Sequence, residues 1–147
     1  MARKTLIALS LAAVIAVPAM LYAATPAGID LARAVQIAEA AGYRDITDID
    51  REDDSWELTT RGADGRKQRV YIEAATGDIL WPAQPGQRQL SAADVMARLA
   101  AAGYADIREL ERDEGYWSAD VRGTAGLSRE LRIHPLTGAI SEARWDD

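Results

Sequence analysis

The stretch Arg69-Val-Tyr-Ile-Glu-Ala-Ala-Thr-Gly-Asp-Ile-Leu-Trp81 predicts a strand, a tight turn at Thr76-Gly77 and a second strand. Glycine suits such a turn because it adopts a positive φ without steric cost. The pattern returns as Glu130-Leu-Arg-Ile-His-Pro-Leu-Thr-Gly-Ala-Ile-Ser-Glu142, where Gly138 takes the place of Gly77. The offset in numbering is therefore 138 − 77 = 61. We expect this hairpin to close a structural unit that occurs twice.

The same offset relates positions along most of the chain without a gap. The equivalent pairs are Gly42-Tyr43 and Gly103-Tyr104, Asp45-Ile46 and Asp106-Ile107, Arg51 and Arg112, Trp56 and Trp117, Arg61-Gly62 and Arg122-Gly123, and Gly65 and Gly126. So many matches in one ungapped register predict a tandem duplication.

Each unit is predicted to be one helix followed by four strands. In the first unit Asp30 is the expected N-cap of a helix over 31–41 that Gly42 ends, and its apolar stripe is Leu31, Ala34, Val35, Ala38 and Ala41. Strands are expected at 46–51, 55–61, 66–74 and 79–81. Alternation within them turns Trp56 and Leu58 inward and Tyr71 outward.

The second unit begins with Ser91 and Asp94 in a capping box, and its expected helical stripe is Val95, Met96 and Leu99. Trp117, equivalent to Trp56, is expected in its core. The predicted fold class is α+β, with two tandem repeats, each one helix packed on a four-stranded antiparallel β-meander.

The first 24 residues differ from the rest of the chain. Arg3 and Lys4 precede a run that is apolar from Thr5 to Val17, and small residues follow at Ala23 and Ala24. This pattern predicts a signal peptide over 1–24, with an uncleaved membrane anchor as the alternative. The remaining boundaries are expected at 29–82 for the first repeat, 83–89 for a linker and 90–147 for the second repeat.

Charge and cysteine content narrow the function classes. The 147 residues carry a formal net charge of −6, and removal of Arg3 and Lys4 leaves 17 − 2 = 15 basic against 23 acidic residues, a net charge of −8. So acidic a chain repels phosphate backbones, which argues against nucleic-acid binding. The chain has no cysteine, which excludes a lipoprotein anchor, and we expect a periplasmic or secreted protein.

The alanine-rich helix, the strand holding Trp56 and the pattern Val70-x-Ile72-x-x-x-Thr76-Gly77-x-Ile79 together resemble a PepSY-type domain, present here as two tandem copies. The acidic residue that usually precedes the turn is displaced in the first copy, and His134-Pro135 replaces it in the second. The architecture is also similar to that of the two-repeat β-lactamase inhibitor protein. The resemblance implies a non-catalytic interaction module that regulates or inhibits a secreted or periplasmic peptidase.

Two groups of residues invite a chemical interpretation. The acidic run from Asp45 to Asp54 lacks the glycine turn of a calcium loop, so solvated edge charges are the favoured interpretation, and divalent-cation or small-ligand sensing is the alternative function. His134, the single histidine, is expected to be an exposed strand residue. No motif marks a nucleophile, so we expect no enzyme, no catalytic or metal-binding residue and no cofactor.

A protein partner, a peptidase or an envelope protein, is therefore expected. Aromatic side chains often anchor protein interfaces. The candidate partner contacts are Tyr71, Trp81 and Trp145, with the turn residues Asp64 and Asp113. Packing between the two units is the alternative role of the aromatic residues. Membrane contact is expected only if the signal segment stays uncleaved.

Overall fold

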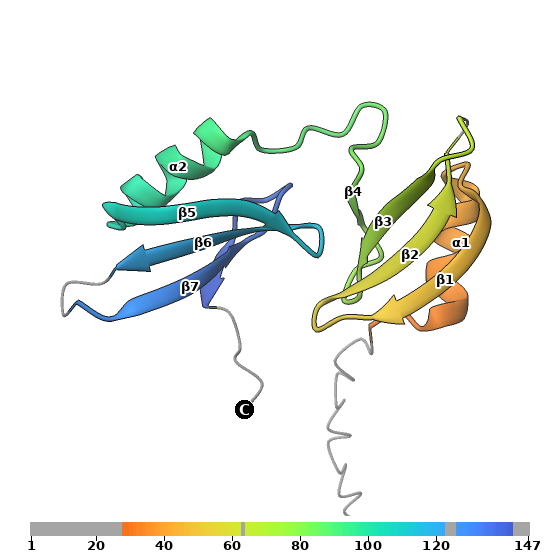
Figure 1. Cartoon of the computed structure of the whole chain (residues 1–147), viewed down its shortest axis with the longest axis horizontal. Helices are drawn as coiled ribbons and strands as arrows, with labels where there is room; N and C mark the ends of the chain where they lie inside the picture. The colour runs from red at the N-terminus through yellow and green to blue at the C-terminus, as the bar shows by residue number, and fades with distance from the viewer. Residues whose placement is uncertain (1–27, 63, 123–125, 143–147) are drawn as a thin grey trace, which may run out of the picture.

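The computed structural model describes residues 28–62, 64–122 and 126–142. They form two units, each with one helix followed by four strands, and the two units lie next to each other (Figure 1). The first unit contains α1 (Leu31–Ala40), β1 (Arg44–Arg51), β2 (Ser55–Arg61), β3 (Lys67–Glu73) and β4 (Ile79–Trp81). The second contains α2 (Ala92–Ala101), β5 (Asp106–Asp113), β6 (Tyr116–Arg122), β7 (Ser128–Ile133) and β8 (Ile140–Glu142).

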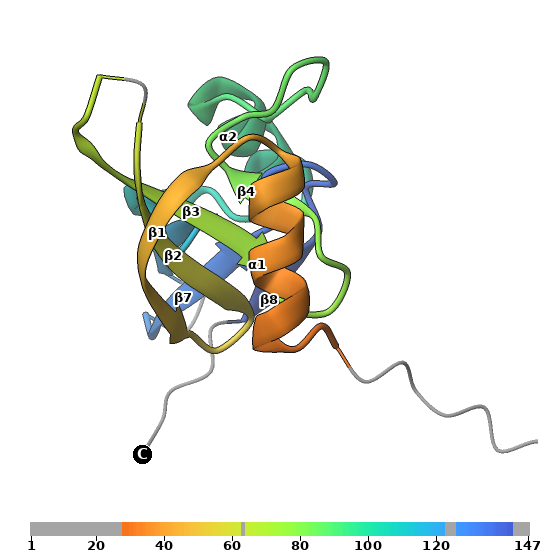
Figure 2. The same ribbon diagram turned by 90° about the vertical axis from the view of Figure 1, so that its right-hand side faces the viewer.

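Each unit is an antiparallel meander with a helix on one face. The sheet orders are β1-β2-β3-β4 and β5-β6-β7-β8, and every neighbouring pair is antiparallel. Figure 2 shows α1 lying across its sheet. The predicted α+β class, with two tandem repeats of one helix and four strands, is confirmed. The first strand begins earlier than predicted, at Arg44 rather than Ile46.

The two cores lie between helix and sheet in each unit. The buried side chains are Ala34, Ala38, Leu58, Val70, Ile72 and Ile79 in one core, and Leu90, Val95, Leu99, Ala119, Val121, Leu131 and Ile133 in the other. Trp56 and Trp117 pack against these cores as predicted. Their indole Nε1 atoms donate to the equivalent carbonyls of Ile29 and Leu90, at 3.1 and 3.2 Å, so each tryptophan also ties down the segment that leads into its helix.

The helix caps follow the sequence closely. The Asp30 carboxylate accepts from the backbone N–H of Arg33 at 2.8 Å, and Ser91 and Asp94 form the predicted capping box. The apolar stripes are narrower than predicted, because Leu31 in the first turn and Met96 are exposed. Met96 directly follows the buried Val95, and each step along a helix turns the side chain by about 100°, which points Met96 away from the sheet.

The Thr-Gly turns close both units as predicted. Gly77 and Gly138 have φ angles of 86° and 72°, in the region that favours glycine. The Oγ1 atoms of Thr76 and Thr137 accept from the backbone N–H groups of Asp78 and Ala139, at 3.1 and 3.2 Å. Of the helices in the described residues, neither is long and apolar enough to cross a membrane.

Candidate functional site at the junction of the two units

The two units meet through the turns that join their first two strands. Figure 1 shows the β1–β2 and β5–β6 hairpins pointing toward each other. The hydroxyl of Ser55 donates to the carbonyl oxygen of Glu114 at 3.2 Å. In the other direction, the Tyr116 hydroxyl donates to Glu73 Oε1 at 3.3 Å. The junction is therefore held by specific polar contacts between the units.

Equivalent positions of the two repeats build both sides of this junction. Ser55 is equivalent to Tyr116, and Glu73 is equivalent to His134, each pair at the repeat offset. The last two contact each other, with 3.4 Å between His134 Nε2 and Glu73 Oε1. A surface patch that packs against its own equivalent is the arrangement of a twofold homodimer. The chain thus reproduces a dimer-like interface inside one polypeptide.

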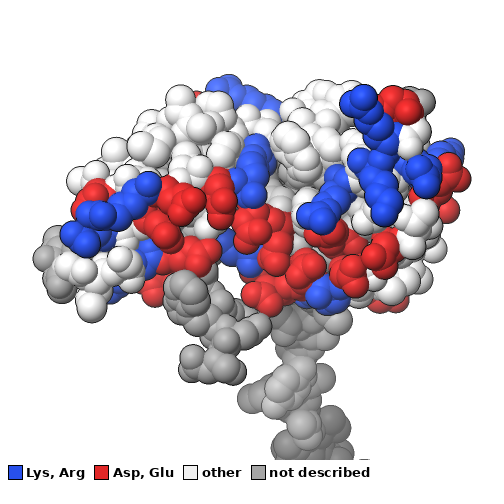
Figure 3. Space-filling model, in the orientation of Figure 1, with Lys and Arg blue, Asp and Glu red and all other residues white. Residues whose placement is uncertain are grey.

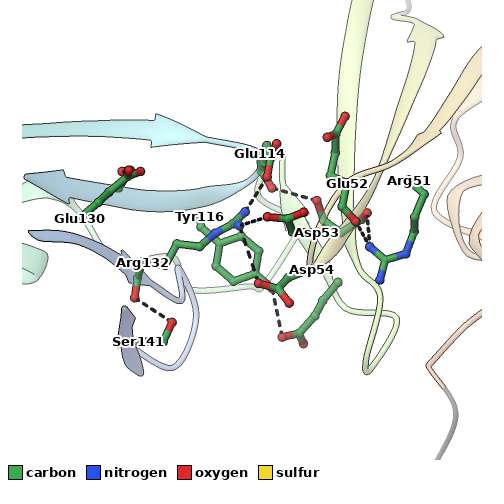
Figure 4. A network of polar contacts seen from close by, with 12 residues as sticks. Arg51, Glu52, Asp53, Asp54, Glu114, Tyr116, Glu130, Arg132 and Ser141 are labelled. Atoms are coloured by element: carbon green, nitrogen blue, oxygen red, sulfur yellow. Dashed lines mark hydrogen bonds and ion pairs between the residues drawn. The ribbon is translucent and has the colours of Figure 1, made fainter. Parts of the chain in front are cut away.

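Arg132 makes the densest set of ionic contacts at the junction (Figure 4). Its guanidinium lies 2.7 Å from Glu114 Oε2, 3.7 Å from Asp54 Oδ2 and 4.0 Å from Asp53 Oδ2, and it is 4.6 Å from the centroid of the Tyr116 ring. Only 12% of its side chain is exposed. Asp53 and Asp54 stay about half exposed, at 48% and 55%, as expected for solvated charges, but the second unit also supplies an arginine to them, which the sequence did not predict.

Tyr71 is the equivalent of Arg132 and contacts the other unit at its Cβ and the base of its ring. It packs on Gly115 so closely that a Cβ at that glycine would lie 2.6 Å from the Tyr71 Cβ. Its hydroxyl donates to Glu57 Oε2 at 2.7 Å. Burial, followed by this bond to Glu57, raises the pKa of Tyr71 to about 12, so the phenol stays protonated over a wide pH range.

His134 lies inside the junction, so the prediction of an exposed strand residue is wrong. Its side chain is 12% exposed and packs edge-on against the ring of Tyr116. Its Nδ1 accepts from the backbone N–H groups of Leu136 and Thr137, at 3.1 and 3.2 Å, while Nε2 faces Glu73. Both nitrogens are engaged, so the imidazole holds the turn and the junction together.

A hollow of about 530 Å³ opens beside the junction. It is lined by Gln68, Arg69, Tyr71, Trp81, Pro82, Arg112, Asp113, Glu114 and Gly115. Three of the side chains predicted to contact a partner, Tyr71, Trp81 and Asp113, therefore lie around one concave surface. We call this surface the junction hollow.

Arg112 fixes the aromatic wall of the junction hollow. Its guanidinium carbon lies 4.9 Å from the Trp81 ring centroid and 4.2 Å from the Trp117 ring centroid, so the cation stands between two indoles. Its Nη2 donates to Gln89 Oε1 at 3.2 Å, and burial lowers its pKa. The Nη1 atom is buried and has no hydrogen-bond partner among the described residues. Trp81 is thus held against a cation while 42% of it remains exposed.

The other two predicted contacts lie elsewhere. Asp64 is exposed in the β2–β3 turn, where it accepts from the backbone N–H of Arg66 at 3.0 Å. Trp145 lies outside the described residues. The sequence did not predict the roles of Arg112, Gly115 and Arg132. The exchange of Tyr71 for Arg132 at one repeat position was the available signal, because such a difference breaks the repeat where the two units meet.

A second hollow, of about 430 Å³, lies at the junction and is lined by residues that include Glu73, Tyr116 and His134. These three side chains contact one another, as described above. Among the described residues, no group of three or more histidine, cysteine, aspartate or glutamate side chains is arranged to hold a metal ion.

Comparison with protein families gave one result. Residues 4–81 and 82–144 each match the model of the family described as peptidase propeptide and YPEB domain, PepSY_2. The two matches together span nearly the whole chain, and they divide it directly after β4. Comparison with curated proteins gave no match, and comparison with solved structures gave none either.

Proposed function

Because the chain belongs to the PepSY family, with two tandem copies of the domain, we propose that it is an exported, non-catalytic module that binds and restrains a secreted or periplasmic peptidase. The family description names peptidase propeptides, which supports a peptidase as the partner. The partner contacts the junction hollow.

The exposure of Trp81 carries this proposal. A tryptophan that is 42% exposed leaves apolar surface in water, although Arg112 stacks on its ring at 4.9 Å beside the junction hollow. Tryptophan, tyrosine and arginine are the residues most often found at the energetic centre of protein interfaces. The junction hollow combines Trp81 with Tyr71 and Arg112, and Asp113 adds an exposed carboxylate at its rim.

A binding role also agrees with the state of the titratable groups. Both ring nitrogens of His134 are engaged, by backbone N–H groups and by Glu73, so neither is free to contact a substrate. Tyr71 and Tyr116 both have raised pKa values, chiefly through burial, and are therefore poor nucleophiles at neutral pH.

Export is the second half of the proposal. The basic start at Arg3 and Lys4 and the apolar run that follows support a signal peptide over 1–24. The proposed mature protein then has its first repeat at 29–82, a linker at 83–89 and its second repeat at 90–147.

Affinity capture with matched variants tests the function. The wild-type chain, Trp81→Ala and Met96→Ala are immobilised and exposed to the envelope and extracellular fractions of the cells that produce the protein. Met96 is the control because it is as exposed as Trp81, at 42%, and lies on α2. We expect wild type and Met96→Ala to retain the same peptidase, and Trp81→Ala to retain at least tenfold less.

The activity of the captured peptidase completes the test. Added wild-type protein should lower its rate of peptide cleavage, and Trp81→Ala should not at the same concentration. Equal capture of the peptidase by all three proteins would show that the partner does not bind at the junction hollow. Capture of partners without any peptidase, or a peptidase whose rate is unchanged, would overturn the proposed regulation.

A further inference from the structure

The edge of the first sheet next to the junction hollow is incompletely paired. β3 spans Lys67–Glu73, but β4 pairs only with Tyr71 and Ile72. Within the described residues, no strand pairs with 67–70 on the side away from β2. β4 cannot extend along this edge because Pro82 follows Trp81 and has no N–H to donate.

The backbone groups of this stretch point into the open space. The N–H of Glu73 donates to the carbonyl of Asp78, on the β4 side. Since successive strand residues direct their backbone groups alternately to the two neighbours, Arg69 and Lys67 present theirs on the same side as Glu73. Gln68 and Arg69 line the junction hollow, so open space lies next to this part of the edge, and Trp81, Pro82 and residues 112–115 form the other walls of that space.

The other outer edges of this sheet are protected. The carbonyls of Ile79 and Leu80 on β4 accept from the side-chain amides of Gln87 and Gln89, at 2.8 and 2.5 Å. β1, at the opposite edge, contains a register shift between Arg44 and Asp48 and carries several acidic side chains. Bulges, charges and covering segments are the usual means of preventing strand addition at an edge. The free segment of β3 is the exception in this sheet.

This free segment lies at the basic end of an otherwise acidic molecule. Figure 3 shows Lys and Arg gathered over the β2–β3 end of the first sheet, and Asp and Glu spread below it. Arg44, Arg61 and Lys67 stand directly opposite one another across three strands. Like charges in such a row repel. Two carboxylates reach this end of the sheet: Glu57 lies 3.1 Å from Arg69, and Asp64 lies 3.7 Å from Arg66. Within the described residues, no carboxylate forms an ion pair with Arg44, Arg61 or Lys67.

We propose that the partner docks an extended acidic segment on β3 at 67–70, adding a strand to the first sheet beside the junction hollow. Strand addition supplies main-chain hydrogen bonds at an open edge. Lys67 and Arg69 share the outer face of the sheet with Tyr71, so the docked segment carries Asp or Glu at alternate positions opposite them. Val70 is buried on the other face, which favours apolar residues at the intervening positions.

The same charges disfavour a second copy of this chain as the occupant. Two β3 edges would place their lysine and arginine side chains against each other, which opposes pairing. The inference rests on the proposed function, because it names the segment through which the partner binds.

The test uses a random library of linear ten-residue peptides displayed on phage and selected on the full chain. We expect the selected peptides to be acidic, free of proline at their centres and to alternate acidic with apolar residues. In hydrogen exchange, a selected synthetic peptide should slow exchange of the Lys67 and Arg69 amides at least tenfold.

A matched pair of variants separates the edge from general electrostatics. Lys67→Ser with Arg69→Glu installs the residues that the second unit has at the equivalent positions, Ser128 and Glu130. It changes the net charge by −3. Arg108→Ser with Arg33→Glu changes the charge equally at exposed positions away from β3. The first variant should weaken peptide binding at least tenfold, and the second less than twofold.

The outcomes distinguish this inference from the proposed function. Peptides that protect the residues around Trp81 but not Lys67 and Arg69 would overturn strand addition and leave the junction hollow as a binding site. Basic or proline-rich selected peptides, or equal weakening by both variants, would also overturn it. Slow exchange of the Lys67 and Arg69 amides without any peptide, in a protein that is also dimeric, would show that a second copy of the chain pairs with this edge. No selected peptide, together with no captured peptidase, would overturn both proposals.

Discussion

Glu73 and His134 hold the same position in the two repeats and face each other across the junction, with 3.4 Å between Oε1 and Nε2. Two identical repeats would place like residues together here, and two carboxylates at this distance repel strongly when partly buried. Histidine removes the repulsion, and its Nδ1 still accepts from the backbone N–H groups of the Thr-Gly turn. Divergence at this position therefore removes one obstacle to the packing of the two units against each other.

This relationship predicts different effects for two substitutions of nearly identical shape. His134→Asn and His134→Asp both keep an acceptor at the position of Nδ1 for the turn, but the aspartate adds a second negative charge near Glu73. At pH 7 we expect the aspartate variant to be less stable than the asparagine variant by about 1 to 3 kcal/mol, because Glu73 is nearby and largely buried. Urea unfolding measures the difference.

The pH dependence of the stability difference between these two variants is the control. The repulsion raises the pKa of the introduced carboxyl in the folded protein, so stability lost at neutral pH returns as the pH falls through that pKa. The stability difference between the two variants should shrink from pH 7 toward about pH 4. A difference that is absent at pH 7, or constant with pH, would contradict an electrostatic role for this contact.

Gly115 predicts a steric test of the junction. Alanine there is strained by the φ of +89° and also meets Tyr71 at 2.6 Å, whereas alanine at Gly126, with a φ of +77°, meets nothing within 4 Å. Gly126→Ala should cost about 1 kcal/mol for the backbone alone. Gly115→Ala should cost about 1 to 3 kcal/mol more because the units must separate. Equal costs in thermal unfolding would show that the two units do not pack at this point.

Arg132 and Arg129 lie on the same strand and give a matched pair of ionic contacts. Arg129 pairs with Glu142 at 2.6 Å in an exposed setting, while Arg132 is largely buried among the carboxylates of both units. Arg132→Ala should lower the free energy of unfolding by about 1 to 3 kcal/mol, because it leaves Glu114, Asp53 and Asp54 without their cation. Arg129→Ala should cost less than about 1 kcal/mol. A larger loss of stability in Arg129→Ala than in Arg132→Ala would mean that the more stabilising ion pair lies outside the junction.

Alkaline titration examines the burial of Tyr71 and Tyr116. Burial is the main cause of the raised pKa of both phenols, and the value for Tyr71 is about 12 against a usual 10.0. A raised folded pKa favours folding below the unfolded pKa, and this contribution is lost as the pH rises from about 10 through 12.

Absorbance at 295 nm follows ionisation of the tyrosines. Between about pH 9 and pH 11 the folded wild type, Tyr71→Phe and Tyr116→Phe should show nearly the same increase, because little of either phenol ionises in that range. A smaller increase in one variant would mean that the phenol removed in it is exposed to water. The junction around that phenol would then be open to solvent as well.

The architecture of each unit was predictable from short stretches of sequence. Asp30 and Ser91 cap their helices, and the Thr-Gly pairs close their hairpins, because these structures depend on residues a few positions apart. The alternation around Trp56 identified the core face for the same reason. The repeat offset then transferred each of these predictions to the second unit.

The site was less predictable because it depends on contacts between units. Nothing local distinguishes His134 or Arg132 from exposed strand residues, and their partners Glu73 and Asp54 belong to the other repeat, far away in the sequence. Tyr71 and Trp81 were named as candidates because aromatic residues are expected at interfaces, and both lie at the junction. The sequence did not show that Arg112 holds Trp81 in place, since that contact forms only when the units pack.

The central claim is that the partner contacts the junction hollow at Trp81. Its most direct test replaces Trp81 with a photoreactive benzoylphenylalanine in the cells that produce the protein, with Met96 replaced in a parallel strain. Both positions are 42% exposed, so simple accessibility does not favour either. Illumination should yield one cross-linked product that contains a peptidase from position 81 and none from position 96. The same product from both positions, or no product from position 81, would contradict the claim.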